Sequence, residues 1–478
     1  MSTPNKSDSK LPADGPDFTP AHNVITAETL QKGEYSEAYY AQRWYKRPIA
    51  QIILVSFVCF MCPGMFNALN GLGGGGKQDA TTADNGNVAL YSTFSVFAFF
   101  GGTVANKIGL KPTLIIGASG YSLYIGALYS TVIAQTQSRE NFVIAAGAIL
   151  GVCAGLLWTA QGAIMLAYAT ERTKGRYVAL FWSIFNFGAV IGAIIPMATN
   201  WNRPEAAAAS GTTYIVFLVL TLVGLGISVF LAQPKNVILP NGRPVEVARQ
   251  PTWVSEFKGL LFALKSDRMV ILLFPFFLSS NWFYAYQFNA INGSGYFGIR
   301  GRSLNNFLYW TSQIVGSIAT GFFLDWKIGR RLRAWAGLVW LTILVFAVFG
   351  GNYAFQRTYT RETVADPNFE SLNINTSKYA GLAFLYVFNG ILDAAWQTYA
   401  YWLMGAMSNE PRRLAYLTGF YKGLQSAGSA ITFRIDALKT PFMTELASTW
   451  GLLAGSLLIM VPVLLFRIHE HTVEEGED

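Results

Sequence analysis

Long apolar runs recur along the whole chain, and they restrict its fold more than any other feature. Of the 478 residues, 52% are hydrophobic and 13% are charged, whereas a soluble protein of this length carries about 25% charge. The runs are close to the length of about 20 helical residues that crosses a hydrocarbon core of roughly 30 Å. The sequence therefore predicts an all-α membrane protein.

Twelve of these runs are predicted to be transmembrane helices, six before and six after a proline-containing linker. They are residues 49–72, 87–106, 112–135, 141–168, 177–198, 212–233, 269–291, 304–325, 334–354, 379–405, 414–435 and 446–467. The predicted units are a disordered cytoplasmic tail (1–48), a six-helix half (49–233), a cytoplasmic linker with an amphipathic helix (234–268), a second six-helix half (269–468) and a cytoplasmic tail (469–478).

If the N-terminus is cytoplasmic, the loops on its side of the membrane hold more basic residues than the loops on the other side. Such an excess of basic residues is typical of cytoplasmic loops. Both termini are therefore predicted to be cytoplasmic. The sequon at Asn375 then falls on the outer side, where it is an acceptor for glycosylation. The plasma membrane is the expected location in preference to an internal membrane.

Composition also argues against several other classes of protein. The net charge is +8, but the basic residues lie between apolar runs, so the predicted partner is a lipid bilayer and not nucleic acid. The cysteines Cys59, Cys62 and Cys153 lie inside apolar runs, and the three histidines lie in the tails. No metal site, cofactor or enzymatic activity is expected.

The loop after the second span carries a motif that recurs in the second half. Gly102, Asn106, Lys107, Gly109 and Lys111 resemble the cytoplasmic signature of the major facilitator superfamily, with Asn106 where the family usually has Asp. The repeat after span eight contains Asp325 and Arg330. The resemblance implies two six-helix halves with pseudo-twofold symmetry and a charge network that gates the inner side. Glu171, Arg172 and Arg176, between spans four and five, are candidates for the same network or for topology-setting charge alone.

Two further segments narrow the resemblance. Residues 62–73, at the end of span one, and residues 169–188, which join spans four and five, are similar to the Unc-ninety-three-like branch of that superfamily in its fungal form. The similarity covers about residues 49–467. Members of that branch are described as regulatory subunits of ion channels or as trafficking partners of receptors, so the resemblance implies the fold more than an activity.

Two ionisable residues lie near the middle of predicted spans, Asp393 in span ten and Lys422 in span eleven. Such groups cost at least about 2.5–3.5 kcal/mol each to insert, so they normally pair with each other or face water. We expect the two to form an ion pair at a central cavity. The pair either couples ion movement to a conformational change or simply holds two helices together.

Amides and aromatic residues on other spans share helix faces with these charges or lie at corresponding depths, and they are the candidates for a substrate cavity. In the superfamily, spans one, four, seven and ten line the path, but each amide has the alternative role of a helix–helix hydrogen bond. The full candidate set is Asn67, Asn70, Trp158, Gln161, Asn186, Asn281, Tyr284, Gln287, Asn389, Asp393, Trp396, Gln397, Lys422 and Gln425.

These features favour a secondary transporter that moves a small solute or ion by alternating access between two halves. Repeats of this kind place the substrate site near the midplane, between the halves. The alternative is a non-transporting regulatory subunit or trafficking partner of an ion channel or another membrane protein.

Overall fold

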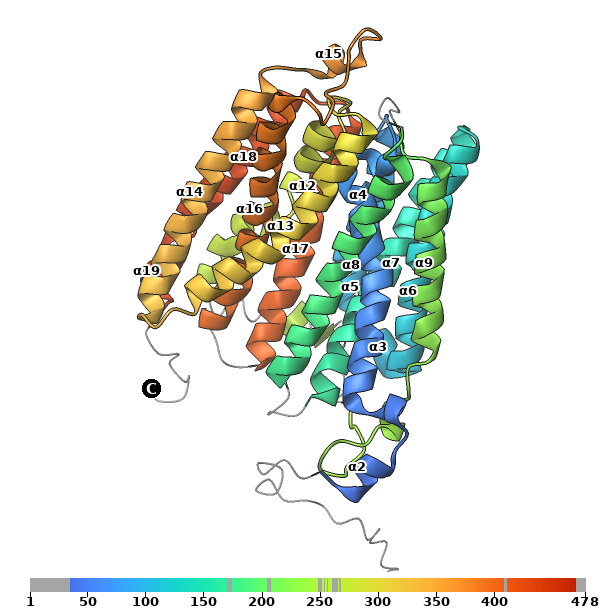
Figure 1. Ribbon diagram of the computed structural model, residues 1–478. Coiled ribbons are helices and arrows are strands. Elements are labelled where there is room, and N and C mark those ends of the chain that lie inside the picture. Colours follow the sequence, from blue (N-terminus) through green and yellow to red (C-terminus); the bar gives the residue numbers. More distant parts are fainter. Residues whose placement is uncertain are drawn as a thin grey trace, which may run out of the picture.

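The computed structural model describes residues 35–169, 174–203, 208–247, seven positions from 252 to 265, and residues 268–407 and 411–469. Within these ranges, the regular structure is helical apart from two isolated bridges. Figure 1 shows long helices running side by side through the molecule, with α2 (Glu37–Ala41) at one end and α15 (Arg361–Ala365) at the other. We call the α15 end the outer end.

The first group of long helices begins with α3 (Pro48–Met61) and α4 (Pro63–Gly71), which continue one another across a break at Cys62. Pro63 explains the break, because proline lacks an N–H group and its ring clashes with the preceding turn. The group continues with α5 (Thr81–Ile108), α6 (Leu110–Ile133), α7 (Gln137–Tyr168), α8 (Lys174–Asn200) and α9 (Gly211–Val229).

The second group begins with an irregular span. It consists of a 3-10 turn (Arg268–Leu273), α11 (Phe274–Ser279), α12 (Phe283–Ala285) and the π-helix η5 (Tyr286–Asn292). Then come α13 (Ile299–Leu324), α14 (Arg330–Gln356), α16 (Ser377–Met407), α17 (Pro411–Ala437), α18 (Phe442–Ile459) and α19 (Val461–Phe466).

Nine helical segments in the described ranges are long and apolar enough to cross a membrane. Helices also occupy the other three predicted positions, as α6, α13 and α17, but α13 and α17 in particular carry arginines and amides that lower their hydropathy. The predicted all-helical membrane fold is confirmed, whereas the count of twelve crossings stays a prediction.

The hydrophobic core is divided into two clusters. One is formed almost entirely by side chains before residue 246, and the other almost entirely by side chains after residue 269. The two groups of helices meet where α5 packs along α17 and α8 packs along α13. Apolar burial therefore holds each group together internally, and the two groups meet along these few helices.

The N-terminal segment is more ordered than predicted. Ser36 donates its backbone N–H to Pro240 O at 3.0 Å, and Gln42 exchanges two hydrogen bonds with the backbone of Ile238. Residues 35–47, part of the tail predicted to be disordered, thus contact the linker in the structure. The amphipathic helix predicted within 234–268 lies mostly outside the described residues, as do residues 1–34 and 470–478.

Candidate functional site

Asp393 is the centre of a buried polar cluster on α16. Its side chain is fully buried, and it accepts hydrogen bonds from Tyr309 Oη at 2.8 Å, Gln397 Nε2 at 2.7 Å and the amide of Gln313. Hydrogen bonds to a charged group are worth about 1.5–3 kcal/mol each, so three neutral donors offset the cost of burying this carboxylate.

A relay of amides leads from Asp393 to Lys422. Lys422 Nζ donates to Gln425 Oε1 at 2.9 Å, and Gln425 Nε2 lies 3.3 Å from Gln397 Oε1. Gln397 in turn donates to Asp393. The Lys422 ammonium also lies over the rings of Tyr401 and Tyr421, at 5.5 and 5.3 Å from their centroids.

The direct ion pair predicted for Asp393 and Lys422 is therefore replaced by an indirect connection. Each charge has nearer partners, neutral donors for the acid and an amide oxygen with two aromatic faces for the base. The relay carries aligned hydrogen bonds from α17 to α16, so a change of charge at one end alters the hydrogen bonding at the other.

A second set of amides adjoins Asp393. The Tyr309 hydroxyl lies 2.8 Å from both Asp393 and Gln287 Oε1, and its one proton serves one acceptor at a time. Gln287 donates to Asn389 Oδ1 at 3.1 Å, and Asn389 forms a reciprocal pair with Asn352 of α14. These contacts join η5, α13, α14 and α16 around one buried acid.

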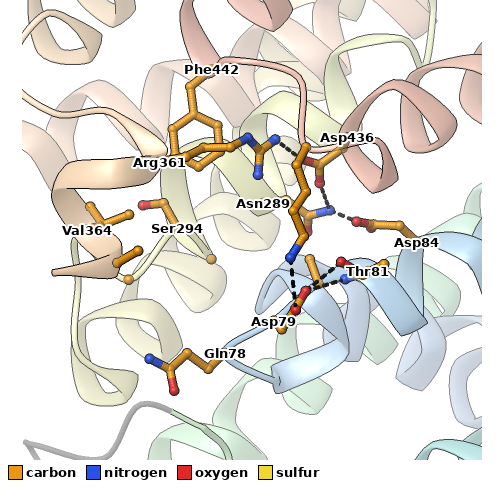
Figure 2. Close-up of a pocket in the computed structure, with 15 residues that line it drawn as sticks. Gln78, Asp79, Thr81, Asp84, Asn289, Ser294, Arg361, Val364, Asp436 and Phe442 are labelled. Carbon is orange, nitrogen blue, oxygen red and sulfur yellow. Dashed lines mark hydrogen bonds and ion pairs between the residues drawn. The ribbon is translucent and has the colours of Figure 1, made fainter. Parts of the chain in front are cut away.

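A cavity of about 370 Å³ lies at the outer end. Figure 2 shows Asp84 of α5 and Asp436 of α17 on either side of Asn289, which donates to both carboxylates at 2.7 and 2.6 Å. Arg361 contacts Asp436 and lies 2.5 Å from Glu445 Oε1. Partial burial lowers the pKa of Arg361, but these two carboxylates outweigh it and raise the pKa above its usual value.

Comparisons with known proteins agree on one family. Residues 81–460 match a family model described as "Ion channel regulatory protein UNC-93". The chain belongs to the UNC-93 family. It is 45% identical to UNC93-like protein C922.05c of Schizosaccharomyces pombe over 95% of this chain and 92% of that protein. It is 37% identical to UNC93-like protein 1 of Arabidopsis thaliana over 95% of this chain and 98% of that one.

The fold of this UNC-93 protein is that of major facilitator transporters. The crystal structure of a mutant of the nucleoside transporter NupG superposes with a TM-score of 0.56, covering 88% of this chain and 99% of the other. The two sequences are only 13% identical, so the likeness shows the fold alone. The chain is thus a multi-pass integral membrane protein with a transporter fold.

Within this UNC-93 protein, the predicted cavity residues fall into two groups. Those on the second group of helices converge: Asn281 accepts from Gln425 at 2.8 Å, and Tyr284 Oη lies 3.3 Å from Gln397 Nε2. Trp396 is an exception, because it is fully buried, stacks on Phe276 and donates to its backbone oxygen at 3.3 Å. Trp396 is therefore part of the hydrophobic packing between α16 and α11.

The candidates on the first group of helices do not join this cluster. Asn70 pairs with Asn87 of α5 at 3.4 Å, which is the helix–helix role left open above. Trp158 packs edge-on against Phe185 of α8, with ring centroids 5.4 Å apart. Gln161 is buried, whereas Asn67 and Asn186 are half-buried.

The predicted cytoplasmic motif lies at the end opposite α15. Gly109 has a φ of 87° between α5 and α6, which forms the expected tight turn. Asn106, Lys107, Asp325 and Arg176 are exposed, Lys111 and Arg330 are half-buried, and Gly102 is buried. Glu171 and Arg172 lie outside the described residues, so the predicted gating network stays a prediction.

Sequence reasoning missed Tyr309 and Gln313 near Asp393, and the whole outer cluster. The outer carboxylates fall just beyond the predicted span edges. Asp84 precedes residue 87, Asp436 follows residue 435 and Glu445 precedes residue 446. The helices extend past these edges, so the three acids lie on helices α5, α17 and α18 and are buried.

Proposed function

We propose that this UNC-93 protein is a secondary transporter that moves a small solute or ion across a membrane by alternating access. Two six-helix halves would rock around the cluster at Asp393. Both termini would lie in the cytoplasm and the α15 end outside, with the plasma membrane as the location. The observation that carries the proposal is the relay from Asp393 through Gln397 and Gln425 to Lys422.

The chemistry of this cluster favours a small organic solute or a hydrated cation. Amide and phenol groups can donate and accept hydrogen bonds, and the aromatic rings of Tyr284, Tyr401 and Tyr421 offer π faces that attract cations. Lys422 and Asp393 contribute one charge of each sign. Ionisable groups at membrane depth commonly mark ion or proton pathways, so Asp393 is the proposed coupling group.

The test is a flux assay with purified protein in liposomes, screened with small organic solutes and monovalent cations under an imposed proton gradient. Asp393→Asn should lower the flux at least about tenfold, a barrier change of about 1.4 kcal/mol. Asp366→Asn, the same change at an exposed loop position, should leave the flux unchanged. If the Asp393→Asn variant kept the flux of the wild type, the coupling role of Asp393 would be ruled out.

The family model's description favours a second candidate, a regulatory subunit of an ion channel. In that case the Asp393 cluster would hold α16, α17 and α13 in one arrangement instead of switching. Co-purification of a stoichiometric channel from native membranes, together with an absence of flux for every solute tested, would support this role over transport.

A further inference from the structure

The outer cluster has more acid than base. Asp84, Asp436 and Glu445 are 1%, 2% and 3% exposed. Among the described residues, the cation that pairs with members of this cluster is Arg361, which contacts Asp436 and Glu445. Three ionised carboxylates and one guanidinium would leave two uncompensated negative charges in a buried place. Uncompensated buried charge is costly enough that such groups usually take up a proton instead.

Asp84 is the member that lacks a cationic partner. Asp436 uses one oxygen for Arg361 and the other for Asn289, while Glu445 uses Oε1 for Arg361. Asp84 Oδ1 accepts from Asn289, but its buried Oδ2 has no hydrogen-bond partner in the part of the chain that the structure describes. This oxygen belongs to a side chain that lines the outer cavity, so it can exchange protons with the solution through that cavity.

Asn289 fixes the distance between the two aspartates. Its Oδ1 accepts the N–H of Gly74 at 2.8 Å, which orients its amide nitrogen toward Asp84 and Asp436. Two acceptors on one trigonal nitrogen lie roughly 4–5 Å apart. Two carboxylates at such a distance in a site with little solvent do not both stay ionised, as in the paired acids of aspartic proteases.

We propose that Asp84 and Asp436 form a proton-binding site that locks the outer end. One proton held by the pair would allow the two acids to approach, and its loss would make them repel. The acids come from α5 and α17, which belong to the two groups of helices, so the repulsion would act across the contact between those groups. We assign a proton as the ligand, and in the described ranges no group of three or more His, Cys, Asp and Glu is arranged to hold a metal ion.

Other titratable groups lie near the cavity but form their own contacts. Lys439 and Asp79 pair with each other at the mouth of the cavity, 3.4 Å apart and largely exposed, and Arg434 lies 3.1 Å from Asn85. Tyrosines approach from α6, η5 and the loop before α15. Tyr124 interacts electrostatically with Asp84, whereas Tyr286 and Tyr359 interact with Glu445. Lys77 interacts with Asp79.

The proposal goes beyond transport, because it can be tested in lipid nanodiscs with no solute present. Spin labels at Ser138→Cys, at the start of α7, and Ser371→Cys, in the segment between α15 and α16, are exposed and report the outer distance by pulsed electron spin resonance. The distance should be short and uniform at low pH and lengthen as the pH is raised and the pair loses its proton. The labels are placed on a background without Cys59, Cys62 and Cys153.

Neutral variants make the test specific. Asp84→Asn mimics the protonated state, so the outer distance should stay short and lose its pH dependence. Asp79→Asn alters the exposed acid of the same cavity and should keep the wild-type pH dependence. Infrared difference spectroscopy of the full chain should show a protonated carboxyl band at neutral pH that disappears in Asp84→Asn.

Three results would overturn the proposal. The first is an outer distance in the wild type that does not change with pH. The second is a pH dependence that survives in Asp84→Asn. The third is a distance that follows sodium or potassium concentration at fixed pH, which would assign the site to a metal cation instead. A failed flux assay would leave each of these readouts intact, so the two proposals fail separately.

Discussion

Two glutamine amides, those of Gln397 and Gln425, separate the Asp393 carboxylate from the Lys422 ammonium. This arrangement differs from an ion pair in its consequences. An ion pair is symmetric in charge and tolerates exchange of its partners, whereas each end of the relay has surroundings suited to one sign of charge. Asp393 faces hydrogen-bond donors, and Lys422 faces an amide oxygen and two aromatic rings.

A charge swap is therefore expected to fail. In Asp393→Lys combined with Lys422→Asp, the new carboxylate would face the electron-rich rings of Tyr401 and Tyr421, which attract cations and not anions. The double variant should be no more stable than the worse single variant, as measured by the thermal unfolding midpoint in detergent. Recovery of the wild-type midpoint would show that the two charges interact directly.

The sequence predicted the two ends of the relay and both of its middle members. Asp393 and Gln397 are four residues apart, and Lys422 and Gln425 are three apart, so helical periodicity placed each pair on one face. Periodicity does not show which face of one helix meets which face of another. For that reason Tyr309 and Gln313, on α13, could not be assigned to Asp393, and Trp396 could not be separated from the cavity candidates.

The outer cluster escaped prediction for a different physical reason. Hydropathy ends a predicted span where charge begins, so Asp84, Asp436 and Glu445 were read as loop residues. In the structure the acids continue the helices and are buried by neighbouring elements. Asn289 belongs to a π-helical turn, and such turns are frequent at functional sites, but no pattern in the sequence indicated it.

The exposed pair of Asp79 and Lys439 should contribute little to the free energy of unfolding. That small contribution should depend on pH in a defined direction. Partial burial raises the pKa of Asp79, but hydrogen bonds from Thr81 and the charge of Lys439 outweigh it and hold the pKa below its usual value. Stability from this carboxylate is therefore present above its unfolded pKa of about 3.9 and is lost as pH falls through the folded pKa. Asp79→Asn should lower stability by less than about 1 kcal/mol at neutral pH.

Thermal unfolding of wild type and Asp79→Asn across acidic pH measures this difference. The gap between the two should close as the solution is made more acidic. A gap that widens on acidification would mean that Asp79 is protonated in the folded protein and that its pairing with Lys439 has been misread.

Asn375 offers a direct test of orientation. It is exposed in the segment between α15 and α16, at the opposite end of the molecule from α2 (Figure 1). Glycosylation acts on the outer side of the membrane, so expression in a eukaryotic host should give a form whose electrophoretic mobility increases on glycosidase treatment. Asn375→Gln should run at that same mobility without treatment, and a cytoplasmic outer end would leave both forms unmodified.

Gly73 lies at a point where the two groups of helices touch. Its φ is 78°, and a Cβ there would lie 2.1 Å from Phe288 O. Gly73→Ala should cost about 2 kcal/mol of stability or prevent the outer end from closing, because neither the backbone angle nor the neighbouring carbonyl accommodates a methyl group. Gly455→Ala, on α18 with open space around it, is the matched control and should be neutral or slightly stabilising. Equal unfolding midpoints for the two variants would contradict this account.

Arg302 connects α13 to the loop after α4. It is 1% exposed. Its Nε donates to Leu72 O at 3.0 Å, and its Nη2 lies 2.9 Å from Leu72 O, 2.8 Å from Gly73 O and 3.0 Å from Lys77 O. A lysine side chain has no second nitrogen, so it cannot reproduce the paired contact of Nε and Nη2 with Leu72 O.

Arg302→Lys should therefore lose at least the Nε hydrogen bond to Leu72 O, or about 1.5–3 kcal/mol, and lower the thermal unfolding midpoint in detergent. Arg300→Lys is the matched control on the same helix, because Arg300 contacts Trp201 at the surface, with an exposed hydrogen bond at 2.9 Å and a ring contact. Its midpoint should stay close to that of the wild type. If Arg302→Lys were as stable as Arg300→Lys, charge alone would hold the loop, and the fork geometry would carry no weight in closing the outer end.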